Sequence, residues 1–446
     1  MALGGGNYTN TKKTLPGAYI NIVSASRSAG VVGERGVVAF AYPLSWNVQS
    51  AVIEVTAEDF YGKSIEIFGY NVEDDEMILF REVFKHAQKI YVYNTNSGGT
   101  KAEKAQVATA KYPGIVGNKI KLKVTPTSRI TNGYDVKTYL GDAIVDSQLV
   151  TKDGTYLSGL VENAYVTFHE NFIAPEEETE HTLSGASNGT TVSDHASAIT
   201  ALSHKSFNVL CAFVADTVNI ERYVSACKAS RDESGVNYQL LVYNTAGTNH
   251  EGVVNLGNSV ATIGSIVPSY GLLLWTAGAM ASCALNTSLT NFTYDGELSV
   301  NVDYTQIELE DKLTNGVFMF HEVGNDIRVL DDINSYVSDT NAKARDIFGF
   351  NQSIRIIDQS VNDIAALFND KYNGKIQNDD AGRIALWSDL VSYYQELERI
   401  RAIEGFTPNS DLAVSAVAGN RRAVSVNATI TIINTMTQLY MTVLVK

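Results

Sequence analysis

The stretch that most constrains the fold is the last one, residues 422–446, because it needs a covering partner. Apolar and polar side chains alternate along it in two runs, which is the period of a half-buried strand. The alternating apolar positions are Val424, Val426, Ala428, Ile430 and Ile432, followed by Leu439, Met441, Val443 and Val445. Between Arg422 and Lys446 there is no charge, proline or glycine, so the usual features that stop a strand edge from recruiting another chain are missing. We therefore expect this segment to be covered, either within its own sheet or by pairing with neighbouring copies.

Length and composition predict a multidomain globular protein. The 446 residues exceed what one core holds and predict about three or four domains. Hydrophobic residues make up 45% of the chain and charged residues 19%, so the chain can bury its apolar surface. The formal net charge of -15 argues against a nucleic-acid partner, because phosphate binding requires a basic surface.

The charge is unevenly distributed along the chain. Residues 1–33 and residues 420–446 each contain three basic residues and no acidic one. Basic ends on an acidic body suit head-to-tail contact between copies, and solvated tails would produce the same pattern. The sequence leaves both interpretations open.

Cysteine usage and hydropathy predict a protein that folds in the cytoplasm and has no membrane span. Cys211, Cys227 and Cys283 lack the spacing of a metal site, so we expect reduced structural thiols. The first residues have no apolar core of a signal peptide. The longest uncharged run, residues 252–294, is interrupted by Asn, Pro and Gly too often to span a bilayer.

The first quarter of the chain predicts an extended arm followed by mixed structure. Residues 4–14 are rich in Gly, Asn, Thr and Lys, and a Pro-Gly turn separates them from a short strand at 18–25. That strand contains Tyr19, Ile20, Ile22 and Val23. Further strands are expected at 36–42, 51–56 and 89–94, and a helix at 77–87.

The middle of the chain changes from β-rich to alternating β and α. Short strands with hairpin-like turns over 111–172 predict a small β-sandwich, and 173–193 reads as a linker or surface loop. An apolar strand at 207–215, a helix at 221–234 and a strand at 237–244 predict a parallel pair joined by a crossover. Residues 271–286 continue this as a buried strand that runs into a small-residue helix.

The last third returns to an α+β pattern. Strands are expected at 316–321 and 327–330. Helices are expected at 359–368 and at 381–403, with the second helix capped by the Asn-Asp-Asp run at 378–380. The two closing strands of the C-terminal stretch follow.

A search for catalytic or metal-binding motifs gives little, and no cofactor is predicted. The motifs GxSxG, HExxH, GxxxxGK[ST] and GxGxxG are all absent. The acidic run at 176–180 beside His181 could hold a metal, but we interpret it as a solvated charge run. His195 and His204 near Ser206 would form a hydrolase triad only under an assumed fold geometry.

Several stretches together resemble the tail sheath protein of contractile phage tails and R-type bacteriocins. LPGAY at 15–19 is similar to the opening of that family, and YPGIVGNKI at 112–120 resembles its YPGxxGNxI element, with Val116 where many members have Trp. Further similar stretches are SLTN at 288–291, YDG at 294–296, LTNG at 313–316, IRVLDDINS at 327–335 and MTQLYMTVLV at 436–445. Their order and spacing extend over nearly the whole chain.

The resemblance implies a fold class, α+β multidomain, with a defined domain order. It implies an extended arm at 1–25, an α/β segment at 26–94 that packs with the central and C-terminal domains, and a β-sandwich at 95–185. A subtilisin-like α/β domain follows at 190–335, and a C-terminal assembly domain with a donated strand at 336–446. In this family the N-terminal arm and the C-terminal strand of neighbours complete a sheet. The tube-facing surface should include 361–403, with Lys371, Lys375 and Arg383 as contacts to an acidic tube.

The implied function is structural and mechanical. Stacked hexameric rings would surround an inner tail tube and contract to drive it through a target cell envelope, with baseplate and tail terminator proteins as further partners. Assembly is expected in the bacterial cytoplasm, and the mature form in a virion tail or released bacteriocin particle. The alternative is a subtilisin-like hydrolase, but the nearest match to its nucleophile motif, Gly278-Ala279-Met280-Ala281, lacks the serine, so we predict no enzymatic activity. A surface-layer or adhesive protein would require an export signal.

Overall fold

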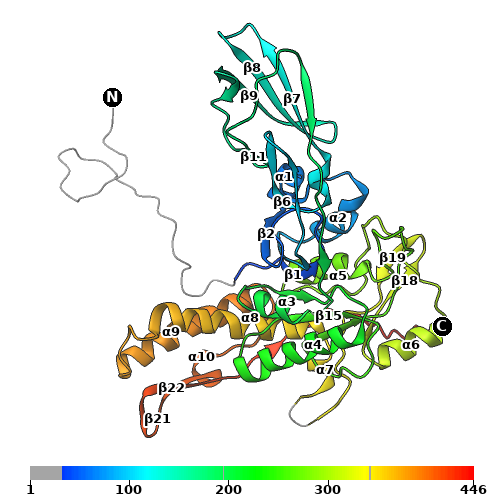
Figure 1. The fold of residues 1–446 in the computed structure, drawn as a ribbon. Coiled ribbons are helices and arrows are strands. Elements are labelled where there is room, and N and C mark those ends of the chain that lie inside the picture. Colours follow the sequence, from blue (N-terminus) through cyan, green and yellow to red (C-terminus); the bar gives the residue numbers. More distant parts are fainter. Residues whose placement is uncertain (1–32, 194, 341–342, 446) are drawn as a thin grey trace, which may run out of the picture. The chain divides into compact units, whose positions relative to one another are not determined.

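The computed structural model of the chain describes residues 33–193, 195–340 and 343–445 (Figure 1). The predicted strand at 18–25, with Tyr19, Ile20, Ile22 and Val23, lies outside the described residues. The chain divides into two compact units. Among the described residues, the larger unit comprises 34–193, 195–340, 343–362 and 434–445, and the smaller unit comprises 33 and 363–433.

The larger unit is built around a seven-stranded sheet. Its strands, in spatial order, are β17 (Val317–Phe318), β16 (Val253–Leu256), β15 (Gln239–Tyr243), β14 (Val209–Cys211), β1 (Val37–Tyr42), β3 (Lys89–Asn94) and β2 (Val52–Thr56). All neighbours are parallel except β2, which is antiparallel to β3. The predicted crossover is confirmed, because helix α4 (Thr217–Ala229) connects the parallel pair β14 and β15.

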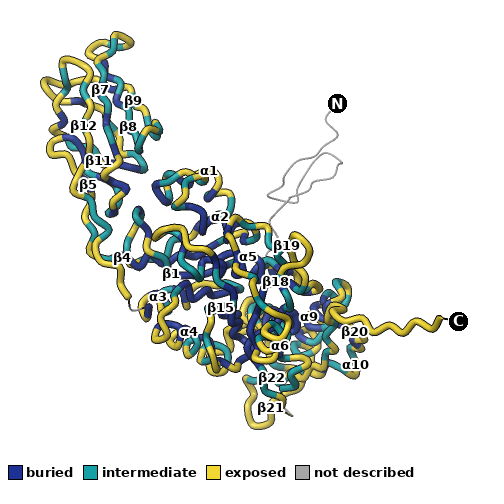
Figure 2. The backbone as a smooth tube through the Cα atoms, turned by 90° about the vertical axis from the view of Figure 1, so that its right-hand side faces the viewer, coloured by how far each residue is buried: buried dark blue, intermediate teal, exposed yellow. Residues whose placement is uncertain are grey.

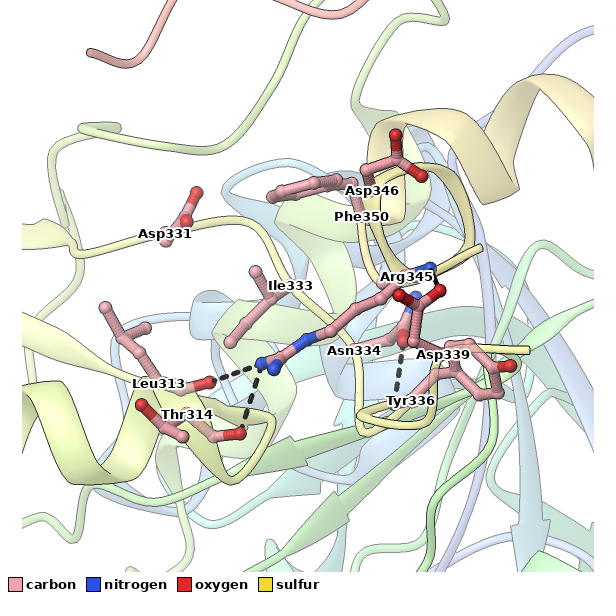
Figure 3. Close-up of a pocket in the computed structure, with 11 residues that line it drawn as sticks. Leu313, Thr314, Asp331, Ile333, Asn334, Tyr336, Asp339, Arg345, Asp346 and Phe350 are labelled. Carbon is pink, nitrogen blue, oxygen red and sulfur yellow. Dashed lines mark hydrogen bonds between the residues drawn. The ribbon is translucent and has the colours of Figure 1, made fainter. Parts of the chain in front are cut away.

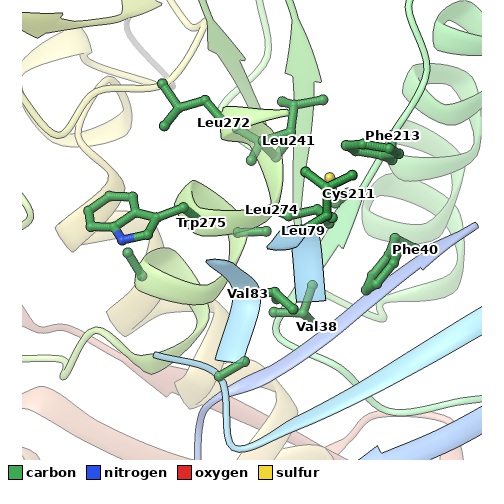
Figure 4. Close-up of a cluster of buried hydrophobic side chains, with 14 of the residues drawn as sticks. Val38, Phe40, Leu79, Val83, Cys211, Phe213, Leu241, Leu272, Leu274 and Trp275 are labelled. Atoms are coloured by element: carbon green, nitrogen blue, oxygen red, sulfur yellow. The ribbon is translucent and has the colours of Figure 1, made fainter. Parts of the chain in front are cut away.

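Helices accompany this sheet on both faces. They are α1 (Ala57–Phe68), α2 (Ile78–Phe84), α3 (Ala196–Ser203), α4, α5 (Leu272–Ser282), α6 (Gln306–Thr314), α7 (Arg345–Phe348) and the start of α8 (Asn351–Leu367), with helical turns η1 (Asp75–Met77) and η3 (Ser230–Ser234). The turn η2 (Ile115–Lys119) belongs to a separate core. Alternate residues of β1 enter different cores: Val38 and Phe40 pack with α2 and α5, whereas Ala39 and Ala41 pack with α3 and α4. Figure 4 shows the first of these cores around Leu274 and Trp275. A sheet covered on both faces explains why its strands are continuously apolar.

Helix α5 corrects one prediction. The sequence at 271–286 suggested a strand leading into a helix, but Leu272–Ser282 is helical throughout and almost entirely buried. An apolar run carries no periodicity, so a buried helix and a buried strand look alike in sequence. Gly278 permits this packing, because a Cβ atom there would lie 2.5 Å from the Val83 carbonyl oxygen of α2.

A β-sandwich occupies the region where the sequence predicts one. One sheet contains β10 (Tyr156–Ser158), β9 (Ala143–Asp153), β8 (Gly133–Leu140), β7 (Ile120–Thr127) and β12 (Thr179–Thr182), and the other contains β11 (Val166–Phe168), β6 (Ala108–Pro113) and β5 (Lys101–Lys104). Two small pairs complete the larger unit: β4 (Asn96–Ser97) with β13 (Thr190–Thr191), and β18 (Phe320–Val323) with β19 (Asp326–Val329). The sandwich has its own core, formed by residues such as Leu122, Val136 and Val166.

The smaller unit is helical with two short strand pairs. After the end of α8 and the turn η4 (Phe368–Tyr372), it contains α9 (Asp380–Arg399) and α10 (Pro408–Asp411). Its strands are β20 (Ile403–Glu404), β21 (Leu412–Val417), β22 (Asn420–Ala428) and β23 (Thr431–Ile432). Asp379 caps α9 by accepting a hydrogen bond from the Gly382 N–H at 2.8 Å, which confirms the predicted helix start.

Candidate assembly site

The smaller unit presents a two-stranded hairpin. Strands β21 and β22 pair in the register Val414 with Val426 and Ala416 with Val424, and Gly419 turns the chain at a φ of 80°. Among the described residues, no third strand joins this pair. A two-stranded sheet leaves backbone groups on both outer edges without ladder partners, so it can accept further strands.

Helix α9 and the segment before it hold the hairpin. The indole N–H of Trp387 donates to the Leu412 carbonyl at 3.1 Å. The Asn378 side-chain amide donates to the carbonyls of Arg421 and Ala423, both at 3.0 Å. The second contact lies where the register of the hairpin shifts, so Asn378 supports the irregular part of β22.

The first predicted closing strand is interrupted. Val424 and Val426 lie in β22, but this strand ends at Ala428, and Ile432 belongs to β23, which pairs with β20 in a separate sheet. The Thr429 N–H still donates to the Asp411 carbonyl at 2.8 Å, one position beyond the Leu412–Ala428 pair. The single strand expected from Val424 to Ile432 is therefore wrong, because the chain then leaves the hairpin and Ile432 pairs with Ile403 of β20.

The second predicted closing strand is absent from the single chain. Residues 433–445 have no regular structure and belong, from Asn434 onward, to the larger unit. The apolar side chains at the predicted strand positions are Leu439, Met441, Val443 and Val445, and they are 85%, 74%, 67% and 91% exposed. Figure 2 shows this last segment in yellow, the colour of exposed residues. Pairing within its own sheet, one of the two expected ways of covering it, is not found among the described residues.

Only the base of this C-terminal tail, which we define as residues 434–445, is fixed to the fold. The Ser353 hydroxyl donates to the Asn434 side-chain oxygen at 3.1 Å, and the Gln352 side-chain oxygen accepts from the Thr435 N–H at 3.0 Å. Ser353 and Gln352 are buried in the first turn of α8. The tail therefore has a rigid attachment point followed by an unsupported apolar segment.

The three predicted tube-facing cations lie in the smaller unit, and each is bound locally. The Lys371 ammonium pairs with Asp389 at 2.5 Å. Lys375 donates to the Asp370 carbonyl. Arg383 donates to the Asn378 side-chain oxygen at 2.9 Å and also pairs with Asp380. These contacts orient the side chains without burying them fully, since Lys371 retains 47% exposure.

The residues considered for catalysis or metal binding are placed in other roles. The His195 ring nitrogen Nδ1 lies 3.0 Å from the Tyr223 hydroxyl within the core, whereas His204 and Ser206 are exposed. In the acidic run, Glu178 pairs with Lys123 at 2.7 Å, and this contact lowers the pKa of its carboxyl group. The described part of the chain contains no group of His, Cys, Asp or Glu side chains that could hold a metal ion.

Sequence reasoning missed two buried ion pairs of the larger unit. Arg355 pairs with Asp332 at 2.7 Å, and Arg231 pairs with Asp358 at 2.6 Å. The Arg355 guanidinium and several hydrogen bonds hold the pKa of Asp332 below its ordinary value, although burial opposes this. Both pairs join residues far apart in sequence, so no local pattern could have revealed them.

No helix among the residues that the structure describes is long and apolar enough to cross a bilayer.

Comparison with known proteins gives matches along almost the entire chain. Family models match four segments: the tail sheath protein Gp18 domain III N-terminal region at 35–94, the phage tail sheath protein beta-sandwich domain at 96–201, the phage tail sheath protein central domain at 188–335, and the phage tail sheath C-terminal domain at 343–446. No comparison supports the hydrolase alternative.

Relatives and solved structures agree with these matches. The phage-like element PBSX protein XkdK of Bacillus subtilis is 27% identical over 445 residues, which cover 93% of this chain and 94% of that protein. The crystal structure of the sheath tail protein from Desulfitobacterium hafniense is 29% identical with a TM-score of 0.78, covering 95% of this chain and 99% of that one. The contracted helical sheath of the anti-feeding prophage, 11% identical, has a similar fold with a TM-score of 0.56 over 96% of this chain and 99% of that one. The chain therefore belongs to the phage tail sheath protein family, and its role is that of a structural sheath protein of contractile injection systems.

Proposed function

We propose that copies of this chain assemble as stacked hexameric rings around an inner tube and contract to drive that tube through a target cell envelope. The observation that carries the proposal is that one chain contains both an uncovered apolar tail and a two-stranded hairpin. A donor strand without a partner and a sheet with open edges are the two halves of a strand-exchange contact. Neighbouring copies supply each to the other.

The strands that we propose to be exchanged come from both ends of the chain. The N-terminal residues Tyr19, Ile20, Ile22 and Val23 and the tail residues Leu439, Met441, Val443 and Val445 are donated, and the hairpin with Val424 and Val426 receives them. Ile430 follows β22, and Ile432 lies in β23, which pairs with β20; we include both among the proposed exchange positions. Main-chain hydrogen bonds hold such a sheet together, and flexible linkers let the remaining domains rotate while the strands stay paired. This permits contraction without dissociation of the subunits.

The proposal requires no bound cofactor and no catalysis. Extended rings are a metastable state, and contraction releases free energy because it increases the contact between subunits. The subtilisin-like description of residues 190–335 then concerns the fold alone, since a fold does not carry an activity with it. We accordingly propose a subunit that is not an enzyme.

A sheath around a tube implies further partners. An acidic inner tail tube is the proposed contact of Lys371, Lys375 and Arg383. Lys371 and Arg383 pair with local carboxylates, whereas Lys375 donates to a backbone carbonyl and keeps its charge available, so Lys375→Glu should weaken tube binding more than ring formation. Baseplate and tail terminator proteins would bind the two ends of the sheath. We propose assembly in the bacterial cytoplasm and a mature form in a virion tail or a released bacteriocin particle.

Electron microscopy of the purified chain tests the proposal directly. The full chain should form hollow cylinders with six-fold rings, and a variant lacking 436–446 should remain a folded, soluble subunit that forms none. A matched control replaces Gln438 and Thr442, the polar positions, by Ser while keeping the apolar ones. Cylinders formed normally by the truncated chain would contradict strand donation by the tail.

A further inference from the structure

A cavity of about 500 Å³ opens in the larger unit beside the base of the tail. Ile333, Tyr336 and Phe350 form apolar walls, and Leu313 and Thr314 contribute the end of α6. Figure 3 shows the Arg345 side chain reaching across the cavity towards α6. Its guanidinium donates to the Thr314 carbonyl at 3.1 Å, so it closes the C-terminal end of that helix and keeps the cavity wall in place.

The tail starts next to this cavity. Its base is held by Gln352 and Ser353 of α8, which follow by two and three positions the wall residue Phe350, located just before that helix. An extended chain covers about 3.3 Å per residue, so the five residues from Thr435 to Tyr440 can reach about 17 Å. The apolar side chains of 436–441 are therefore tethered within reach of an apolar hollow that they do not fill.

The cavity is acidic, whereas the tail residues 436–441 carry no charge. Asp331, Asp339 and Asp346 line the cavity with a single cation, Arg345. Residues 434–446 carry one basic residue, Lys446, and no acidic one. The tail can therefore approach the cavity without bringing one carboxylate against another.

We propose that the cavity receives the apolar side chains of residues 436–441 from the same chain, so that a free subunit stores its own tail. A tethered segment is present at an effective concentration of about a millimolar, which a neighbouring copy in dilute solution does not reach. Inside a ring the neighbour is equally close, and a complete sheet replaces the stored contact. The release step rests on the proposed function, whereas the docking step does not.

Cross-linking of the full chain tests the docking step. Cysteines are placed at Thr442 in the tail and at Asp346 on the exposed rim of the cavity. The native thiols of Cys211, Cys227 and Cys283 are buried, and burial raises the pKa of Cys227 to about 12, so they do not compete. Mild oxidation of dilute subunits should give an intramolecular disulfide, seen as a faster-migrating monomer on a non-reducing gel.

Two matched variants locate the contact. Thr314→Trp places a large side chain at the cavity from an exposed helix end and should slow this cross-link about tenfold. Ile307→Trp, on the same helix but outside the cavity, should leave its rate unchanged. Moving the rim cysteine to Ile307 detects a tail that merely collapses onto α6, and equal rates at positions 346 and 307 would overturn the proposal. Disulfide-linked dimers in place of the monomeric product would also overturn it.

Assembly gives an independent readout of the release step. Because Thr314→Trp frees the tail, it should shorten the lag before cylinders form, whereas Ile307→Trp should not. Loss of the cross-link together with assembly that still needs 436–446 would reject the storage site and leave strand donation intact. A cross-link in a chain whose assembly ignores 436–446 would reject strand donation and leave the storage site intact.

Discussion

Two stretches of this chain are equally apolar and uncharged, yet one is buried and the other is exposed. Helix α5, Leu272–Ser282, lies between the central sheet and α2, and its Leu274 and Trp275 side chains are completely covered. The tail from 436 to 445 has Met436 99% exposed and Leu444 88% exposed. The difference lies in what the chain supplies as a covering surface. Composition shows that an apolar segment needs a covering surface. Only the three-dimensional fold shows whether the same chain provides that surface.

The largest effect should come from the buried member of this pair. Trp275→Ala removes a completely buried ring and the 2.8 Å hydrogen bond that its indole donates to Asp295, and should lower the free energy of unfolding by about 3–5 kcal/mol. Leu444→Ala, beyond the segment 436–441, should change it by less than about 0.5 kcal/mol. Chemical denaturation of both variants measures the contrast. Similar losses for the two would show that Leu444 is also packed in the free subunit.

Substitutions in the tail should affect assembly more strongly than they affect the free energy of unfolding. Met441→Pro removes a backbone donor and disfavours a paired strand, so it should raise the concentration needed to form cylinders at least about tenfold. Met441→Val keeps both the apolar character and the strand propensity and should assemble normally. Sedimentation across a concentration series measures the threshold. An equal threshold for the proline variant would mean that the tail does not pair through its backbone at this position.

A glycine in α5 tests how closely the buried stretch is fitted. Gly278→Ala places a Cβ atom 2.5 Å from the Val83 carbonyl oxygen, so α2 and α5 must separate, at a cost of about 1–3 kcal/mol. Gly374→Ala in the smaller unit meets no atom within 4 Å but has a φ of 71°, so any loss there comes from backbone strain alone. Thermal unfolding compares the two. A neutral Gly278→Ala would contradict the close helix contact.

The stability of the buried region should depend on pH at acidic values, whereas the tail should show no such dependence. The folded-state pKa of Asp332 is held below its ordinary value of 3.8, so its ion pair with Arg355 stabilises the fold above that pH. The stabilisation is lost as the pH falls from 3.8 through the folded-state pKa. Hydrogen exchange should therefore accelerate in the neighbouring elements below this pH after correction for the intrinsic rate. Residues 436–445 contain no carboxylate side chain and should show no such step.

The smallest effect should come from the hairpin of β21 and β22. Asn378→Ala removes two hydrogen bonds to the irregular part of β22 and should cost about 1 kcal/mol or slightly more. Asn373→Ala, whose amide bonds only the side chain of Asn369, is the matched control. Amide exchange of β22 measures the local loosening. Unchanged protection in Asn378→Ala would show that α9 alone holds the hairpin.

The sequence predicted the helices and strands that have a clear hydrophobic periodicity or a strong capping residue. The alternation of β and α from 207 to 244 revealed the parallel pair, and the polar run before α9 revealed its start. The strands at 36–42 and 89–94 were expected, but their pairing beside β14 was not, because no local signal links Val38 to Val209. Helix α5 was misread because a completely buried segment lacks a polar face.

The sequence predicted that the tail needs a covering partner, but it did not predict the contacts that position the tail and the hairpin. The uncharged tail indicated that a covering partner is needed. The break between β22 and β23 was not predicted, because no local signal links Ile432 to Ile403 of β20. Gln352, Ser353 and Asn378 were missed altogether. Each is an ordinary polar residue whose importance comes from the backbone group that the fold places opposite it.

The attachment of the tail to α8 has a mechanical consequence. A tension applied through Thr435 reaches Gln352 and Ser353, one turn from the Arg355–Asp332 ion pair and next to Asn351, which itself bonds Asp332 at 3.0 Å. Pulling on the tail therefore loads the rigid interior of the subunit instead of stretching a surface loop. A force delivered in this way moves the larger unit as a body, so a partner that holds the tail would pull on the core of the subunit directly.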